Sequence, residues 1–251
     1  MTDHILIERR GAVQIIRMNR PEKKNALTRA MYGAMSAALG KGDADPSVRV
    51  HVFLGVPGAF SAGNDLSDFL AVATGAEGGN EVWDFLMALA NSQKPMVSGV
   101  DGIAVGIGTT LNLHCDLTFA TPRTVFRTPF VDLGLVPEAG SSLLAPQILG
   151  RQGAFALLGL GEGISAEHAR RVGLIYDVVE EDGLEGAVLA AAEDIAAKPP
   201  EALKIARDLM RGPRDELVAR IGEEAEHFRQ RLKSAEAHAA LSAFMSRKKA
   251  G

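Results

Sequence analysis

Two glycine-rich segments, each directly after an apolar run, constrain the fold of this chain most strongly. The apolar run 48–54 leads into GVPGAFSAGND (residues 55–65), whose three glycines allow unusual backbone angles. The run 95–100 leads into a glycine-rich turn over 102–108 and then into a short helix that ends near Leu113. Apolar runs of this length bounded by turn residues predict buried strands. The exposed amides of such turns, helped by a helix N-terminus, suit the stabilisation of a developing negative charge, although both segments could simply be tight turns.

Short strands and helices alternate through the first 198 residues, and the pattern turns wholly helical from about Pro199. The remaining predicted elements of the first part are hairpin strands over 5–9 and 13–18, helices over 28–39 and 80–89, and strands over 116–120 and 124–127. Thr28 has the side chain of a helix N-cap. We therefore predict a mixed α/β core over residues 1–198 and a helical oligomerisation region over residues 199–251.

The helical region carries two apolar stripes at helical spacing. The first consists of Leu217, Val218, Ile221, Ala225, Phe228 and Leu232. The second consists of Ala240, Leu241, Phe244 and Met245. Helices of this kind after a finished core pack on a neighbour, which is either the core of the same chain or another subunit.

Composition excludes several classes of protein. The chain has 251 residues, enough to bury a sizeable core, and its net charge of −4 gives no reason to expect nucleic acid. Its single cysteine, Cys115, excludes an internal disulfide and fits a reducing compartment. No apolar run approaches the roughly 18 residues of a membrane span, and the N-terminus lacks the pattern of a signal peptide. We expect a cytoplasmic protein that binds neither nucleic acid nor membrane.

Most familiar catalytic motifs are incomplete here. GIGTTL (residues 106–111) begins like a dinucleotide fingerprint but has Leu111 where the third glycine belongs, and no nucleotide P-loop is present. Ser61 is one residue out of register with a nucleophile elbow, which favours an ordinary loop serine. The six histidines lack metal-ligand spacing, and His114 is predicted to be a helix-end or core residue. The sequence therefore predicts no metal and no cofactor.

A carboxylate stands in the apolar segment VDLGLVPEAG (residues 131–140), just before a predicted helix capped by Ser141 or Ser142. Burial of Glu138 would raise its pKa and the helix end would lower it, which leaves a plausible general base. A glutamate that merely caps the helix is the alternative.

Three of these segments together resemble the crotonase superfamily, the enoyl-CoA hydratase/isomerase family, in order and spacing. They are NRPEKKNAL (19–27), FSAGNDL (60–66) and GIAVGIG (102–108), and the resemblance extends over nearly the whole chain. It implies an α/β fold built as a spiral of strand–strand–helix turns with a C-terminal helical region, assembled as a homotrimer or hexamer. It also implies an acyl-CoA substrate, whose thioester carbonyl is held by the backbone amides of Asn64 and Ile107.

The resemblance further implies a set of substrate-binding residues in or near these motifs: Lys23, Lys24, Ala26, Ala62, Gly63, Asp65, Leu66, Phe130 and Lys248. Lys23 and Lys24, with the basic run 247–249, are candidates for contacts to the CoA phosphates. Solvated surface charge is the alternative for these lysines and for the C-terminal run.

One departure from the hydratase pattern indicates the subgroup. Hydratases of this family activate water with two glutamates, and the matching positions here are Thr110 and Phe130, which cannot act as bases. The segment around Glu138 is similar to the peroxisomal-type Δ3,Δ2-enoyl-CoA isomerases of fatty acid metabolism, in which one glutamate takes a proton from C2 and returns it to C4. The predicted activity is therefore enoyl-CoA isomerisation with Glu138 as the base.

Three alternatives stay open at this point. Asp132 could be a second acid, as in dienoyl isomerases, or a structural residue. Another crotonase-type reaction, such as isomerisation of a ring-derived acyl-CoA or weak hydration, would fit the same single acid. A non-catalytic crotonase-fold binding protein is the third.

Overall fold

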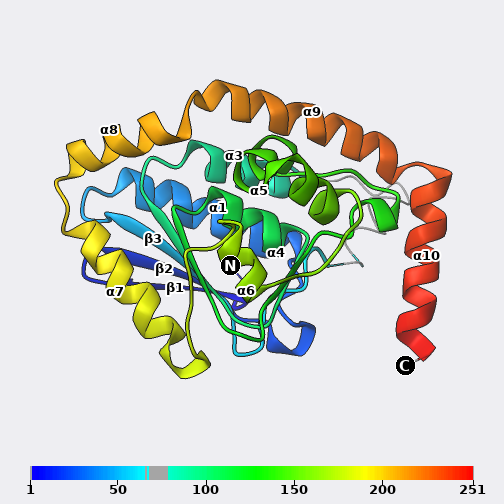
Figure 1. The fold of residues 1–251 in the computed structure, drawn as a ribbon, viewed down its shortest axis with the longest axis horizontal. Coiled ribbons are helices and arrows are strands. Elements are labelled where there is room, and N and C mark those ends of the chain that lie inside the picture. Colours follow the sequence, from blue (N-terminus) through cyan, green and yellow to red (C-terminus); the bar gives the residue numbers. More distant parts are fainter. Residues whose placement is uncertain (1, 66, 68–78, 251) are drawn as a thin grey trace.

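The computed structural model describes residues 2–65, 67 and 79–250, and it is built from three similar turns of chain (Figure 1). Each turn adds a strand to a six-stranded sheet, then a strand to a four-stranded sheet, and then a helix. The turns are β3 (Val50–Leu54), β4 (Ala59–Ser61) and α3 (Glu81–Asn91); β5 (Met96–Val100), β6 (Ile103–Val105) and α4 (Ile107–Thr110); and β7 (Leu117–Ala120), β8 (Val125–Arg127) and α5 (Ser141–Leu158). This order confirms the predicted α/β class with its strand–strand–helix turns.

The larger sheet has the order β1-β2-β3-β5-β7-β10, and the smaller has the order β4-β6-β8-β9. The remaining strands are β1 (Ile5–Arg10), β2 (Val13–Met18), β9 (Ile164–Ser165) and β10 (Asp177–Val178). β1 and β9 pair antiparallel with their neighbours, whereas every other pairing is parallel. β4 lies within the first glycine-rich segment and β6 within the second, and because these strands are parallel neighbours, the residues that follow them leave the sheet at the same edge. The small sheet therefore brings the two segments together.

Helices cover the larger sheet on both sides. α7 (Leu184–Ala196) packs Val188 and Leu189 against the strand residues Val52 and Val97 (Figure 1). The other face packs against the main core, to which α1 (Arg29–Ala44) contributes. The predicted cap of α1 is confirmed by the Thr28 hydroxyl, which accepts a hydrogen bond from the Met31 amide at 3.3 Å. The helix runs beyond its predicted end at Leu39.

α1 and α3 are locked together by aromatic rings. The Tyr32 and Phe85 centroids lie 5.5 Å apart, and Phe85 meets Phe53 of β3 edge-on at 6.5 Å. Such tilted and edge-on pairs suit the quadrupoles of the rings. The packing fixes Tyr32, whose hydroxyl donates to Asn64 Oδ1 at 2.5 Å.

The chain after Pro199 is helical, in α8 (Pro200–Arg211), α9 (Arg214–Leu232) and α10 (Ala235–Ala250), and a small α6 (Ala166–Arg171) precedes this region. α8 and α9 run along the top of Figure 1, with α9 above α3 and α5, and α10 descends at the end. Ile221 and Leu232 of the first predicted stripe are buried in the core of the same chain. That stripe therefore packs on the chain's own core, while the role of the region in oligomerisation stays a prediction.

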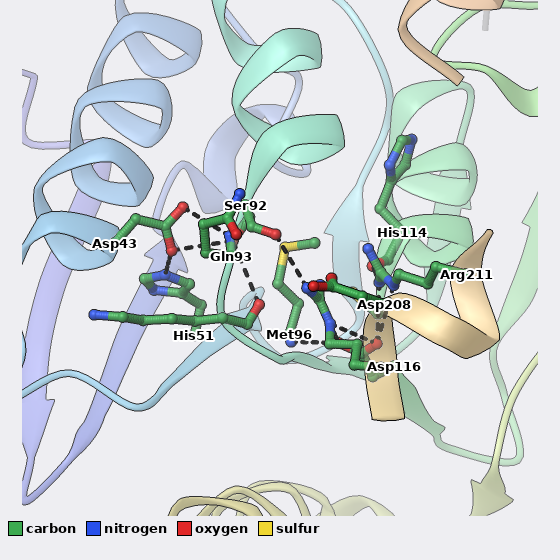
Figure 2. A network of polar contacts seen from close by, with 12 residues as sticks. Asp43, His51, Ser92, Gln93, Met96, His114, Asp116, Asp208 and Arg211 are labelled. Atoms are coloured by element: carbon green, nitrogen blue, oxygen red, sulfur yellow. Dashed lines mark hydrogen bonds and ion pairs between the residues drawn. The ribbon is translucent and has the colours of Figure 1, made fainter. Parts of the chain in front are cut away.

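A network of ion pairs and hydrogen bonds, centred on Asp116, holds α8 against the core (Figure 2). The Arg207 guanidinium donates to the Asp116 carboxylate at 2.9 Å and to the Ser92 carbonyl at 3.0 Å. Asp116 also accepts the Met96 amide at 2.8 Å, and Arg211 donates to it at 3.2 Å. Because Arg207 is buried, loss of either partner would leave an unpaired charge in the interior. The network therefore anchors α8, the first helix of the C-terminal region, to the core.

The described ranges contain neither a membrane-spanning helix nor a metal-binding cluster. None of their helices combines the length and the apolar character that crossing a bilayer demands. Within the same ranges, no three His, Cys, Asp or Glu side chains are grouped so that they could hold a metal ion.

Candidate active site

A cavity of about 760 Å³ lies between α1, α3, α9 and the loops that follow β4 and precede α5. Its apolar lining includes Leu27, Val82, Trp83, Leu86, Phe228 and Leu232. Its polar lining includes Tyr32, Asn64, Asp65 and Glu138. The cavity therefore joins a largely apolar chamber to the predicted Asn64 and Glu138, which are far apart in the sequence, and its size suits a small-molecule ligand.

The two glycine-rich segments touch at this site. A Cβ on Gly63, whose φ is +86°, would lie 3.0 Å from the Val105 carbonyl oxygen, and one on Gly108 would lie 2.8 Å from that of Ser61. Only glycine allows this approach of the two backbones. Sequence reasoning recognised the glycines, and the structure shows that each makes room for the other segment.

The predicted amide donors lie on these adjacent segments. Leu27 pairs with the strand-like loop around Asn64, donating to the Gly63 carbonyl at 2.8 Å and accepting the Asp65 amide at 2.9 Å. Ile107 is the first residue of α4, where an amide has no partner within the helix. In the described part of the chain, neither the Asn64 amide nor the Ile107 amide donates a hydrogen bond. Asn64 lines the cavity, whereas the buried Ile107 is not among the described residues that line it.

The first predicted motif supports the second. The Ala62 amide donates to the Lys24 carbonyl at 2.9 Å, and the buried Asn25 amide group donates to the carbonyls of Ala59 and Phe60 at 3.0 and 3.1 Å. Lys23 and Lys24 are exposed, and Ala26 is half-buried. In the motif 19–27, it is therefore Asn25, rather than the two lysines, that supports the second motif.

Asp65 is held as a carboxylate. Its side chain accepts from the Arg20 guanidinium at 2.6 Å, and Arg20 also donates to the Ala26 carbonyl at 2.8 Å. Burial alone would raise the pKa of Asp65, but hydrogen bonds from Ser67 and Arg20 together lower it. The ion pair between Arg20 and Asp65 links the first two motifs, and it makes Asp65 poorly suited to take up a proton.

Glu138 lies in the cavity wall with its carboxyl group buried. The Thr110 hydroxyl donates to Glu138 Oε1 at 2.5 Å, and nearby the Tyr32 hydroxyl donates to Asn64 Oδ1 at 2.5 Å. Burial raises the pKa of Glu138 to about 8; the Thr110 hydrogen bond acts in the opposite direction and the charge of Glu224 adds to the rise. A carboxyl group with such a pKa can both accept and return a proton near neutral pH.

The predicted capping of α5 by Ser141 or Ser142 is wrong. The amides of Gly140 and Ser142 instead donate to the carboxylate of Glu224, on α9, at 2.6 and 2.9 Å. Glu224 therefore occupies the helix N-terminus. The expected lowering of the Glu138 pKa by the helix end is replaced by a rise from burial and a second carboxylate.

The other predicted residues fall into three groups. Ser61 is the last residue of β4 rather than the predicted loop serine, and its buried hydroxyl donates to the Asn25 carbonyl at 2.8 Å. His114 is buried at the end of a short helix, as predicted. Phe130 is buried outside the cavity lining, and Asp132 pairs with Arg127 at 3.2 Å on the surface, with half of each side chain exposed. Leu66 and the side chain of Lys248 lie outside the described residues.

Sequence reasoning missed Tyr32, Trp83 and Glu224. Only Glu224 carried a readable signal. It falls three residues after Ile221 and four before Phe228, so it is a charged residue on the apolar stripe.

Comparison with known proteins identifies the family of this chain. The family model described as enoyl-CoA hydratase/isomerase matches residues 8–251. Rat enoyl-CoA delta isomerase 2 is 35% identical over 250 residues, and the alignment covers 97% of this chain but only 64% of that protein. The 1,2-epoxyphenylacetyl-CoA isomerase of Escherichia coli K12 is 29% identical, with 99% of this chain and 97% of that protein covered. The structure of Pseudomonas aeruginosa OdaA is 42% identical with a TM-score of 0.92, covering 97% of this chain and 99% of that one. The chain therefore belongs to the enoyl-CoA hydratase/isomerase family of the crotonase superfamily and is an enzyme of that family.

Proposed function

We propose that this enzyme is an enoyl-CoA isomerase, which moves a double bond from C3 to C2 of an acyl-CoA. One observation carries the proposal. Asp65 and Glu138 are the only carboxylates in the described cavity lining, and Asp65 is committed to Arg20. Glu138 is thus the one acid there that is free to move a proton, and an isomerase needs only one. The first matched relative, which is much longer than this chain, bears the name of such an isomerase.

The reaction consists of two proton transfers through Glu138. The carboxylate takes a proton from C2, and the electrons of that bond pass to the thioester oxygen as an enolate. The amides of Asn64 and Ile107 hold this oxygen, and one such donor is typically worth about 3–4 kcal/mol. The electrons then return through the conjugated system, and C4 receives the proton from Glu138. No water is added or lost.

Substrate contacts follow from the placement of the motifs. The exposed Lys23 and Lys24 bind the CoA phosphates, and the segment containing Ala26 and the loop at Ala62 and Gly63 border the thioester. Asp65 contributes by holding Arg20. The acyl group occupies the apolar chamber. Phe130, which lies beside Gly106, stays a predicted contact. Leu66 and Lys248 also stay predicted contacts.

We propose a homotrimer or hexamer. Three large apolar side chains of α8 support a subunit contact, because they are more than half exposed in the single chain: Ile205 58%, Leu209 79% and Met210 78%. Light scattering at micromolar concentration tests this, and a stable monomer would contradict it.

The activity is tested by incubating the purified enzyme with 3-enoyl-CoA and 2-enoyl-CoA esters and identifying the products. We expect 2-enoyl-CoA from the first ester, and little 3-hydroxyacyl-CoA from either. Thr110 and Phe130 stand where hydratases have their water-activating glutamates, so hydration of crotonyl-CoA at a rate within about tenfold of isomerisation would overturn the proposal.

A second candidate is isomerisation of a ring-derived acyl-CoA. It is favoured by the name of the Escherichia coli relative, which is covered almost end to end, and by Trp83 and Phe228 in the chamber. Faster turnover of an aromatic epoxide acyl-CoA than of any 3-enoyl-CoA would make it the better assignment.

A further inference from the structure

α9 is in direct contact with the turn that carries Glu138. Gly140 has a φ of +70°, and a Cβ there would lie 2.3 Å from Leu217 Cδ1 of α9. From the same helix, Glu224 reaches the turn and accepts the amides of Gly140 and Ser142 at 2.6 and 2.9 Å. Figure 1 shows α9 running above α5. The second residue after Glu138 is therefore bound by a side chain 84 residues away in the sequence.

The turn has a conformation that needs such support. Ala139 has a φ of +60°, a left-handed value that is uncommon for residues other than glycine, and Gly140 follows it in the same region. The Ala139 carbonyl accepts a hydrogen bond from Nε2 of the buried His114 at 2.7 Å. His114 thus holds the turn from the core and Glu224 holds it from α9.

Resting on the proposed role of Glu138 as the base, we propose that Glu224 is a positioning residue for it. Through its two amide contacts, α9 sets the place of the Glu138 carboxyl group in the cavity and the charge around it. Glu224 is 6% exposed and does not line the cavity in the described chain, so it acts through the turn rather than on the substrate.

The charged groups around Glu138 and Glu224 distinguish Glu224 from the other residues near the turn. Among the residues that the structure describes, the other titratable or charged groups that face the cavity or the turn are Arg29 and Tyr32 from α1, Asp65 after β4, His114 after α4, and Arg220, Arg229 and Lys233 from or next to α9. Burial raises the pKa of Tyr32 and lowers that of His114 to about 4, so both are neutral near pH 7. Burial is the main cause that raises the pKa of Glu138, and the charge of Glu224 adds to the rise; the Glu224 carboxylate also accepts the amides at the start of α5.

The test compares E224Q with E216Q, a control on the same helix at a position that is exposed to solvent. E138Q is measured in parallel. For E224Q we expect kcat to fall by about tenfold or more, because small displacements of a reacting group are costly. The Kd of a non-reacting acyl-CoA should stay within about twofold. The midpoint of the rise of kcat/KM with pH should move to lower pH, and E216Q should match the wild type throughout.

An E224Q enzyme with wild-type kcat and an unmoved midpoint would overturn the proposal, even if its Tm were lower. E224D keeps the charge but is one methylene shorter, so it is the second variant if E224Q does not fold. It should lose kcat while its midpoint stays in place, and wild-type kcat in E224D would also overturn the proposal. If E138Q remains active, the proposed function itself fails. If E138Q is inactive and E224Q is normal, only the role of Glu224 fails.

Discussion

The two halves of the site are built in different ways. The proposed amide donors at Asn64 and Ile107 belong to the backbone, and they lie on two segments that the parallel pairing of β4 and β6 brings together. Glu138 is a side chain on a turn, and its place depends on contacts from Thr110, His114 and Glu224. The first half follows from sheet topology and two glycines. The second half is assembled by three other parts of the chain.

This difference has a chemical reason. Stabilising an enolate oxygen requires only fixed donors, which any backbone can supply where no side chain intervenes. Moving a proton requires a carboxyl group of suitable pKa, and that value depends on burial and on neighbouring charge. The backbone half should therefore fail through steric change, whereas the side-chain half should fail through changes in charge.

The largest effect is expected from E138Q, which keeps the size of the side chain and removes the base. A positioned general base contributes about 10²–10⁴-fold, so isomerisation should fall by at least about two orders of magnitude. The Kd of an acyl-CoA should change little, because the amide donors are untouched. Parallel measurements of turnover, Kd and Tm check this. Surviving turnover with lower stability would instead indicate a purely structural glutamate.

The backbone half is broken by G108A. The added Cβ would lie 2.8 Å from the Ser61 carbonyl, so the two segments must separate. We expect kcat to fall by about tenfold to a hundredfold and stability to fall by about 1–3 kcal/mol. G186A is the control, because that helical position has nothing within 4 Å of a Cβ and alanine favours a helix. Normal turnover in G108A would contradict the close apposition of the segments.

How much the sequence could predict follows the same division. The strands and the two glycine-rich segments were predictable because apolar periodicity and glycine spacing are local signals. The contact of Thr110 with Glu138 was not, since its residues lie 28 positions apart and meet only through the fold. The cap of α5 was predicted wrongly for the same reason, because Ser141 and Ser142 were the local candidates and Glu224 is distant.

The charge dependence of the side-chain half is tested by pH and by T110V. Glu138 must lose its proton to act as the base, so kcat/KM of the wild type should rise about tenfold per pH unit below about 8 and then level off. Because the Thr110 hydrogen bond lowers the pKa of Glu138, T110V should move this midpoint to higher pH. A pH–rate profile of both enzymes checks the direction, and an unchanged midpoint would show that the hydroxyl has no part in setting the pKa.

The same group links stability to pH. The folded-state pKa of Glu138 is raised from 4.5 to about 8, so the folded protein binds more protons than the unfolded chain between these values. The resulting stabilisation is complete below about pH 4.5 and is lost as pH rises through about 8. Tm should therefore fall over this range more steeply in the wild type than in E138Q, which cannot titrate there. Equal slopes would contradict the raised pKa.

The smallest effect is expected from D132N, and its smallness decides whether a second acid takes part. Asp132 is paired with Arg127 at 3.2 Å, both side chains are 51% exposed, and Asp132 is not among the described residues that line the cavity. Exposed ion pairs contribute about 0–1 kcal/mol, so D132N should change stability by less than about 1 kcal/mol and leave kcat and the pH profile as in the wild type. A second proton-transferring acid would behave differently, with a large loss of kcat and a changed limb in the profile. Steady-state kinetics of D132N beside E138Q separates the two cases, because a one-base enzyme loses turnover in E138Q alone and a two-acid enzyme loses it in both.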